Sequence, residues 1–301
     1  MSDRFIQNKL ALITLLSACG IILVSMGLRQ TFGLFFSVFE EALSVSRTEF
    51  GLAIGIQMFF WGLMAPIFGL FADKYGGNKA VFLGFLVFGL GIFLLFNGPN
   101  TGIYFQLSLG VLVGTALGAT AMSVPVSEVG KHFSNEKRTL ATGIVTASAS
   151  VGYFATPLFT KYSLIEFGWE NTLLYYLFFI LFGLIASIFL FPVKKSVILE
   201  STSIKKQSFI EAIKEAFSHK GYVLLVSGFF VCGFQITLVA THIPGYMQEK
   251  GLGEWSAAII LALIGFFNII GTLGMGYLGT KYSKKILLSI LYFSRAVVIA
   301  L

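Results

Sequence analysis

Two arginines stand inside stretches of sequence that are otherwise apolar, and they are the side chains best suited to bind a small charged molecule. Arg29 lies within the apolar run 10–39, and Arg295 lies in a run that begins near residue 285. A charge at the centre of a bilayer costs at least about 2.5–3.5 kcal/mol, so such a residue marks a candidate functional site. No Asp or Glu lies deep in any apolar run. An anionic ligand is therefore the natural partner, because guanidinium binds carboxylate through two parallel hydrogen bonds.

Three uncharged or titratable side chains in apolar runs are candidates for the same cavity. His242 precedes Pro244 and could titrate near neutral pH, and Gln235 lies two turns earlier on the same helical face. Asn268 lies in the middle of its run and could donate to a substrate oxygen. We predict five substrate-binding residues: Arg29, Gln235, His242, Asn268 and Arg295.

Each candidate also has a purely structural interpretation. An arginine can donate to backbone carbonyls and hold two helices together, and an asparagine can hydrogen-bond a neighbouring helix. A histidine beside a proline can be hydrogen-bonded at a helix kink. The sequence contains no phosphate-binding loop and no paired catalytic carboxylates, and Cys19 and Cys232 lack metal-ligand spacing. We therefore expect no enzyme activity, no cofactor and no metal site.

The elements that must position these residues are long apolar helices. The chain has 301 residues, of which 56% are hydrophobic and 12% are charged, whereas soluble domains carry about 25% charged residues. A helix needs about 20 mostly apolar residues to cross a bilayer. Such runs occupy 10–39, 50–72, 79–97, 101–127, 139–164, 169–192, 221–247 and 255–279, and a ninth begins near 285. The sequence predicts an all-α polytopic membrane protein with eight complete transmembrane helices and a partial ninth.

The basic residues predict an orientation in the membrane. Of the 21 Lys and Arg residues, 16 fall at the ends and links on the side of the N-terminus, and three fall on the opposite side, namely Arg47, Lys161 and Lys250. By the positive-inside rule, the N-terminus and the long basic link 193–220 are cytoplasmic. This distribution accounts for the net charge of +7 without a nucleic-acid partner.

The long link divides the chain into three predicted parts. Residues 1–192 form a six-helix bundle, and 193–220 form a cytoplasmic link that contains a short amphipathic helix over 208–217. Residues 221–301 form an incomplete C-terminal transmembrane bundle. Within the first part, Gly110, Gly114 and Gly118 form a ladder of small residues that predicts close helix packing.

Three segments carry a resemblance to the major facilitator superfamily. GLFADKYGGNK at 69–79 resembles that superfamily's motif between its second and third helices. The segments GLRQTFGLF at 27–35 and KRTLATGI at 137–144 are similar to its monocarboxylate-transporter and oxalate–formate-antiporter branch. The resemblance implies the major facilitator fold. It also implies a cytoplasmic gate that latches the two halves and is formed by Gly69, Asp73, Lys74, Gly76 and Lys79.

The resemblance also has departures. Members of this superfamily usually have twelve spans, so this chain resembles about three quarters of one and is expected to be C-terminally truncated, without transport activity of its own. Thr280 stands where the repeated loop motif usually has an acid, and Asn268 stands where mammalian branch members carry one.

The expected function is secondary active transport of small monocarboxylate or dicarboxylate anions by alternating access, coupled as proton symport or anion exchange. The expected location is the cell membrane, with membrane lipid and a small carboxylate as partners and a monomeric state. Two alternatives stay open: a carrier of the same superfamily for a drug or sugar, and a truncated membrane protein or sensor that does not transport.

Overall fold

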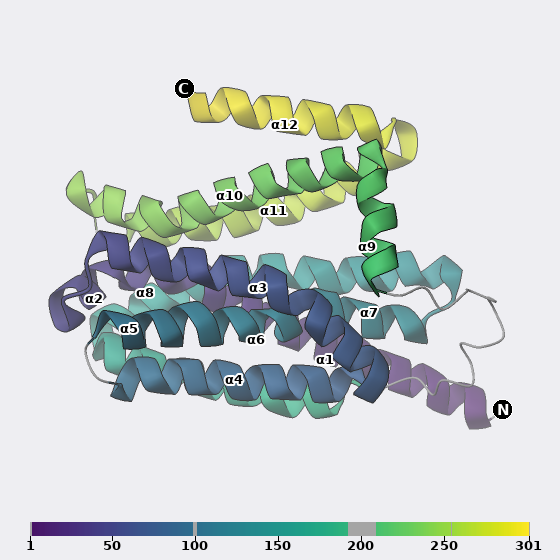
Figure 1. Cartoon of the computed structure of the whole chain (residues 1–301), viewed down its shortest axis with the longest axis horizontal. Helices are drawn as coiled ribbons and strands as arrows, with labels where there is room; N and C mark the ends of the chain where they lie inside the picture. Colours follow the sequence, from purple (N-terminus) through teal and green to yellow (C-terminus); the bar gives the residue numbers. More distant parts are fainter. Residues whose placement is uncertain (1, 99–100, 192–208, 254, 301) are drawn as a thin grey trace.

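The computed structural model describes residues 2–98, 101–191, 209–253 and 255–300, and every regular element in these ranges is helical (Figure 1). The N-terminal elements are α1 (Ser2–Thr31), η1 (Phe32–Phe35), α2 (Phe36–Leu43), α3 (Arg47–Tyr75), α4 (Gly77–Asn97), α5 (Gly102–Phe105), η2 (Gln106–Leu112), α6 (Val113–Thr120), α7 (Ser123–His132) and α8 (Asn135–Ile188). The remaining helices are α9 (Phe209–Ser218), α10 (Lys220–Glu249), α11 (Ser256–Lys281) and α12 (Lys284–Ala300).

Six of the described segments are long and apolar enough to cross a membrane. They cover 8–43, 47–75, 77–97, 102–132, 136–188 and 220–249. The two runs predicted over 139–164 and 169–192 fall together in α8, which reverses at Gly168, where φ is 78° and ψ is 173°. Glycine tolerates this positive φ because it has no Cβ. The all-helical, multi-span fold is confirmed, and the count of eight complete spans with a partial ninth stays a prediction.

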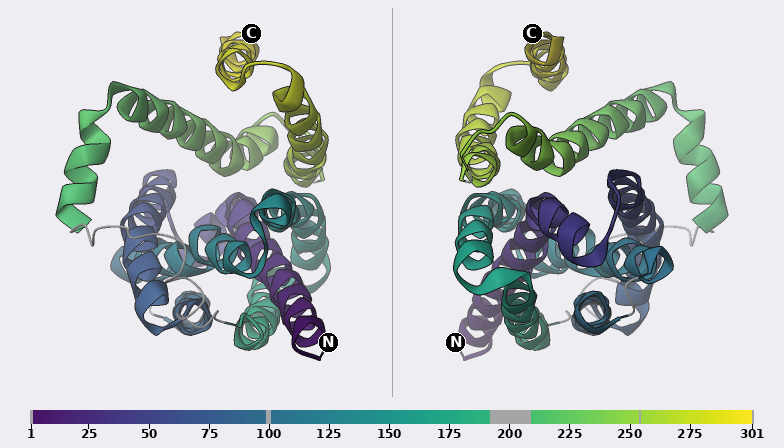
Figure 2. Two further views of the ribbon diagram at one scale, coloured as in Figure 1. Left: turned by 90° about the vertical axis from the view of Figure 1, so that its right-hand side faces the viewer. Right: turned by 90° about the vertical axis from the view of Figure 1, so that its left-hand side faces the viewer.

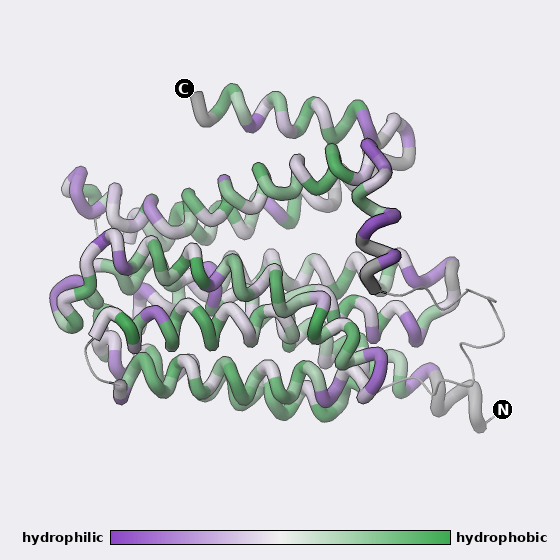
Figure 3. The backbone as a smooth tube through the Cα atoms, viewed as in Figure 1, coloured by the Kyte–Doolittle hydropathy of each residue, from purple (hydrophilic) through white to green (hydrophobic). Residues whose placement is uncertain are grey.

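The long helices lie side by side, with apolar middles and polar ends (Figure 3). The N-terminus and α9 lie at the same end of this arrangement (Figure 1). The helix predicted over 208–217 is described as α9 from Phe209 onward, and it runs across the direction of the long helices. Residues 193–208 of the predicted link lie outside the described residues.

The N-terminal helices enclose a hydrophobic core of their own, whose buried members run from Ala18 to Leu190. The glycine ladder lies against α3. A Cβ on Gly114 would lie 2.9 Å from the Cα atom of Gln57, and one on Gly118 would lie 2.7 Å from Cβ of Met64. Close packing at these glycines, as predicted, is thereby confirmed.

The helices α10 and α11 form a layer on one side of the N-terminal helices, and α12 lies on the far side of this layer (Figure 2). Within this layer α10 packs on η1, and α11 packs on α8. A second, small apolar cluster lies at these contacts: Leu34, Ala240, Ala257, Ala258 and Leu261. The division of the chain at 192 and 220 stays a prediction.

Candidate functional site

A narrow polar pocket lies where the end of α1 and η1 meet α3 and α10. The space between its lining atoms is about 240 Å³ when the part open to solvent is included. The room that this leaves for a guest is about that of one water molecule. Its lining comprises Arg29, Gln30, Phe32, Gly33, Ile54, Gln57, Met58, Thr237, Ala240 and Thr241. Because the lining comes from both sides of the contact between the N-terminal helices and α10, movement of α10 would change its size.

Arg29 is the charged residue of this pocket and is only 9% exposed. Its Nη2 atom donates to Thr237 Oγ1 at 3.1 Å and to Met58 Sδ at 3.3 Å. The guanidinium carbon lies 5.1 Å from the ring centroid of Trp61, and Tyr153 interacts with the same group. All of these partners of Arg29 are side chains. The structural interpretation of this arginine had instead predicted hydrogen bonds to backbone carbonyls.

The positive charge of Arg29 has no acidic partner among the described residues, and its buried Nε atom has no hydrogen-bond partner there. Burial of a charge without an opposite charge is costly. A carboxylate that entered the pocket would supply both the missing charge and the missing acceptor.

Two glutamines line the pocket beside Arg29, and sequence reasoning missed both. Gln30 and Gln57 are each 1% exposed. Gln57 Nε2 donates to the carbonyl of Leu109 at 3.1 Å, within the π-helical segment η2. Oε1 of Gln30 has no hydrogen-bond partner in the described structure. Both glutamines are polar residues within apolar runs. The same feature made Gln235 a candidate substrate-binding residue, so it could also have identified Gln30 and Gln57.

The structure does not bring Gln235 or His242 into this pocket. The face of α10 that lines it carries Thr237, Ala240 and Thr241, whereas His242 is exposed. Successive helical residues are rotated by about 100°, so His242 points away from the face that carries Thr241. The prediction that Gln235 and His242 bind substrate stays a prediction.

Asn268 and Arg295 instead make contacts between helices. Asn268 Nδ2 donates to Ser150 Oγ at 3.0 Å and thereby joins α11 to α8. Arg295 Nη1 donates to Cys232 Sγ at 3.0 Å and joins α12 to α10. Neither lines the pocket of Arg29. The contact of Asn268 matches its structural interpretation, whereas Arg295 joins two helices through a side-chain sulfur and not through backbone carbonyls. The role of both residues in substrate binding stays a prediction.

The predicted gate motif surrounds the junction of α3 and α4. Lys131 Nζ lies 3.2 Å from Asp73 Oδ1 and 2.8 Å from Oε1 of Glu128, which is 2% exposed. Gly76 has φ 102°, and a Cβ on Gly77 would lie 2.6 Å from Cδ of Glu128.

The other gate residues make fewer contacts. Lys74 Nζ lies 4.9 Å from the ring centroid of Tyr75, Lys79 is exposed, and a Cβ on Gly69 would meet nothing within 4 Å. The ion pairs of Lys131 with Asp73 and Glu128 join residues of the N-terminal helices to one another. A latch between the two halves stays a prediction.

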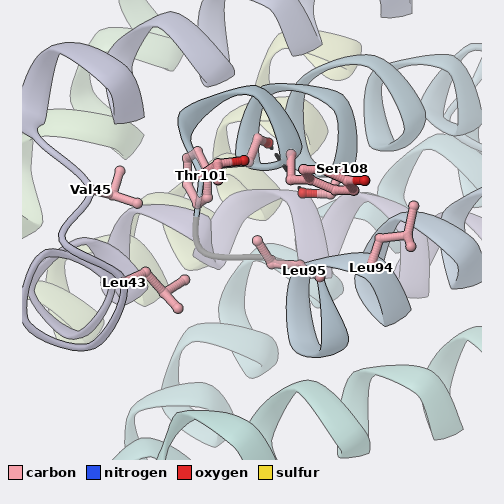
Figure 4. A pocket seen from close by; sticks show the side chains of 9 residues that line it. Leu43, Val45, Leu94, Leu95, Thr101 and Ser108 are labelled. Carbon is pink, nitrogen blue, oxygen red and sulfur yellow. Dashed lines mark hydrogen bonds between the residues drawn. The ribbon is translucent and has the colours of Figure 1, made fainter.

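A second pocket lies between α2, α4 and α5 (Figure 4). These elements lie at the end of the molecule opposite the N-terminus (Figure 1). It has about 290 Å³ of empty space, and leucines and a valine provide much of its lining, including Leu43, Val45, Leu94 and Leu95. It contains none of the predicted site residues. The polar pocket around Arg29 is therefore the better candidate site.

Comparisons with known proteins agree with this architecture. The family model described as Major Facilitator Superfamily matches residues 18–301. The chain is 23% identical over 278 residues to "Uncharacterized MFS-type transporter YcxA" of Bacillus subtilis, covering 89% of this chain and 65% of the relative. It is 22% identical over 300 residues to human monocarboxylate transporter 2, covering 91% of this chain and 61% of the relative. The chain thus spans less than two thirds of these relatives.

Among solved structures, the chain resembles a bacterial homologue of the human lysosomal transporter Spinster, described as inward-facing and unoccupied. The TM-score is 0.65 at 19% identity, and the match covers 92% of this chain and 64% of the other. A peptide transporter matches with a TM-score of 0.55 at 15% identity. At these identities the likeness concerns the fold.

Proposed function

Because the chain belongs to the major facilitator superfamily, we propose that it is the greater part of a carrier that moves small carboxylate anions across the cell membrane by alternating access. The family indicates a transporter and not an enzyme. The choice of a carboxylate substrate rests on one observation. Arg29 is a buried cation that has no acidic partner among the described residues.

The chemistry of the pocket favours a carboxylate over other small anions. Arg29 presents a planar group of donors, and its Nε edge has no partner in the described structure. A planar carboxylate matches this group with two parallel hydrogen bonds. The names of several relatives support the same class, including human monocarboxylate transporter 2 and rat monocarboxylate transporter 13.

The position of the pocket supports alternating access as the mechanism. Arg29 belongs to α1 and its hydrogen-bond partner Thr237 belongs to α10, so a ligand bound there touches both sides of the contact. When the two sides separate, the pocket widens and the ligand can leave. The coupling is proton symport or anion exchange. We place the N-terminus and α9 on the cytoplasmic side, because most basic residues lie at that end.

Uptake by the full-length protein that contains this chain tests the proposal. Radiolabelled lactate uptake is measured in membrane vesicles for the wild type, Arg29→Lys and Arg29→Ala at matched expression. Removal of one partner of a buried charge pair costs about 2–5 kcal/mol, so Arg29→Ala should lower uptake at least about thirtyfold. Arg29→Lys should retain part of it, because lysine keeps the charge but loses the planar group.

The exposed Lys137 provides a matched control, because Lys137→Ala removes one positive charge outside the pocket. Its uptake should equal that of the wild type. Unchanged carboxylate uptake in Arg29→Ala would refute the proposal.

A further inference from the structure

A third pocket lies on the same contact between the N-terminal helices and the layer of α10 and α11. Its lining comes from η1, α8, α10, α11 and the turn between α10 and α11. The space between its lining atoms is about 290 Å³ when the part open to solvent is included. Gln248 lines this pocket and donates to Ser37 of α2, which places the pocket at the end of the molecule opposite the N-terminus (Figure 1).

Lys161 of α8 is the charged residue that lines this outer pocket, and it is half-buried. In the described part of the chain, its ammonium group has neither an ion-pair partner nor a hydrogen-bond acceptor. The two other basic residues predicted for this end are engaged. Arg47 pairs with Glu249, and Lys250 Nζ lies 5.6 Å from the ring centroid of Tyr246. Lys161 thus offers an uncompensated positive charge at the contact between the two groups of helices.

An anion that approaches this end meets mostly negative charge. Four exposed glutamates lie on α2 and on either side of the reversal in α8: Glu40, Glu41, Glu166 and Glu170. These side chains repel an anion, whereas a cation inside a cleft raises the local concentration of anions there. Lys161 is therefore placed to draw an anion past the glutamates to the contact with α10.

A backbone contact separates the outer pocket from the pocket of Arg29. Gly33 and Ala240 line the Arg29 pocket, and Pro244 lines the outer one. A Cβ on Gly33 would collide with the carbonyl oxygen of Ala240 and lie 3.2 Å from Cγ of Pro244. Ala240 and Pro244 are about one helical turn apart, so separation of α10 from η1 would join the two pockets.

We propose that the pocket of Lys161 is a second, outer binding site for small carboxylate anions, which holds the substrate before it passes to Arg29. A lysine is a point charge on a flexible stem and attracts an anion in many orientations, whereas the planar guanidinium of Arg29 holds a carboxylate in one. The outer site therefore captures, and the inner site orients. This inference rests on the proposed carboxylate transport, and it adds a site on the route to Arg29.

Protection of a cysteine in the pocket wall tests binding at the outer site. The full-length protein is prepared without other cysteines, with Cys19→Ala and Cys232→Ala in this part of it. Leu252→Cys then places a thiol in the lining, at a residue that is 50% exposed. Lactate should slow the labelling of this thiol by a membrane-impermeant maleimide. The slowing should persist with Arg29→Ala and be lost with Lys161→Gln.

The salt dependence of uptake separates attraction of an anion from a structural role of Lys161. At low lactate concentration and about 0.01 M salt, Lys161→Gln should lower initial uptake about two- to fivefold. The difference should disappear in about 1 M salt, where charges interact over only about 3 Å. Lys161→Arg should keep the wild-type uptake, because it keeps the charge. A loss of packing would instead lower uptake at both salt concentrations.

Lys250→Gln is the matched control, because it removes the same charge from the same end but outside the pocket. Its uptake should equal that of the wild type at both salt concentrations. If the wild type takes up no lactate, the proposed carboxylate transport fails. If Lys161→Gln and Lys250→Gln behave alike, or if lactate still protects Leu252→Cys in the presence of Lys161→Gln, the outer site is refuted while carboxylate transport stands.

Discussion

Arg47, the first residue of α3, forms an ion pair with Glu249, the last residue of α10. The guanidinium carbon of Arg47 also lies 5.4 Å from the ring centroid of Phe36, and Gln248 Nε2 donates to Ser37 Oγ at 3.0 Å. These contacts join α10 to the N-terminal helices at the end opposite the N-terminus. We therefore expect them to limit access to the Arg29 pocket from that end.

Reversal of one charge in this pair should open that end with little loss of stability. An exposed pair contributes about 0.2–1 kcal/mol, so Arg47→Glu should leave the melting temperature nearly unchanged. In a background with Cys19→Ala and Cys232→Ala, Thr241→Cys reports access to the pocket through labelling by a membrane-impermeant maleimide. Arg47→Glu should speed this labelling, and Arg47→Glu with Glu249→Arg should restore the original rate. Equal rates in all three proteins would show that the ion pair does not control access.

A methyl group at Gly265 should disturb the contact between α11 and α8. A Cβ there would lie 2.5 Å from the backbone carbon of Tyr153 and 2.9 Å from Cα of Phe154, and backbone atoms cannot move cheaply. We expect Gly265→Ala to destabilise the protein by about 1–3 kcal/mol, measured by thermal unfolding in detergent. Gly271→Ala in the same helix is the control, because a Cβ there would meet nothing within 4 Å. Equal melting temperatures for the two variants would contradict the close approach.

Loss of Lys131 should be far more damaging than loss of Asp73, although both belong to one charge cluster. Glu128 is 2% exposed, so Lys131→Gln leaves a buried carboxylate without its ion-pair partner at a cost of about 3–5 kcal/mol. The side chain of Asp73 is 70% exposed, and Asp73→Asn should cost less than about 1 kcal/mol. Thermal unfolding gives the order, and adding Glu128→Gln to Lys131→Gln should recover much of the loss. The reverse order of the two single variants would contradict the role of burial.

A double-mutant cycle on Ser150 and Asn268 should separate the two interpretations of Asn268. If the asparagine serves to join α11 to α8, Ser150→Ala and Asn268→Ala should be coupled by about 0.5–1.5 kcal/mol in stability. Both should then leave the apparent KM for lactate unchanged in the full-length protein. A rise in KM with Asn268→Ala alone would instead assign it to substrate binding.

The architecture follows from the sequence because long apolar runs and the distribution of Lys and Arg depend on local composition. Arg29 was identifiable because a charge in an apolar run is rare. Gln30 and Gln57 were not, because an uncharged amide there has many structural uses. The contact face of α10 could not be predicted, because this helix is apolar on most sides and no pattern in its sequence marks the face that meets the N-terminal helices. The pairing of Asp73 with Lys131 joins residues 58 positions apart, and local pattern does not reveal such partners.

The alanines between the two groups of helices have a consequence for movement. Ala240, Ala257 and Ala258 supply three of the five buried members of the small cluster there. Methyl groups interlock less deeply than leucine or phenylalanine side chains, so we expect these three positions to hinder sliding of α10 and α11 over the N-terminal helices less than Leu34 and Leu261 do. The energy barrier to that sliding should then come from the large side chains that remain, such as Phe154 and Phe266, and from the polar contacts at the edges, which a bound ligand can break or replace.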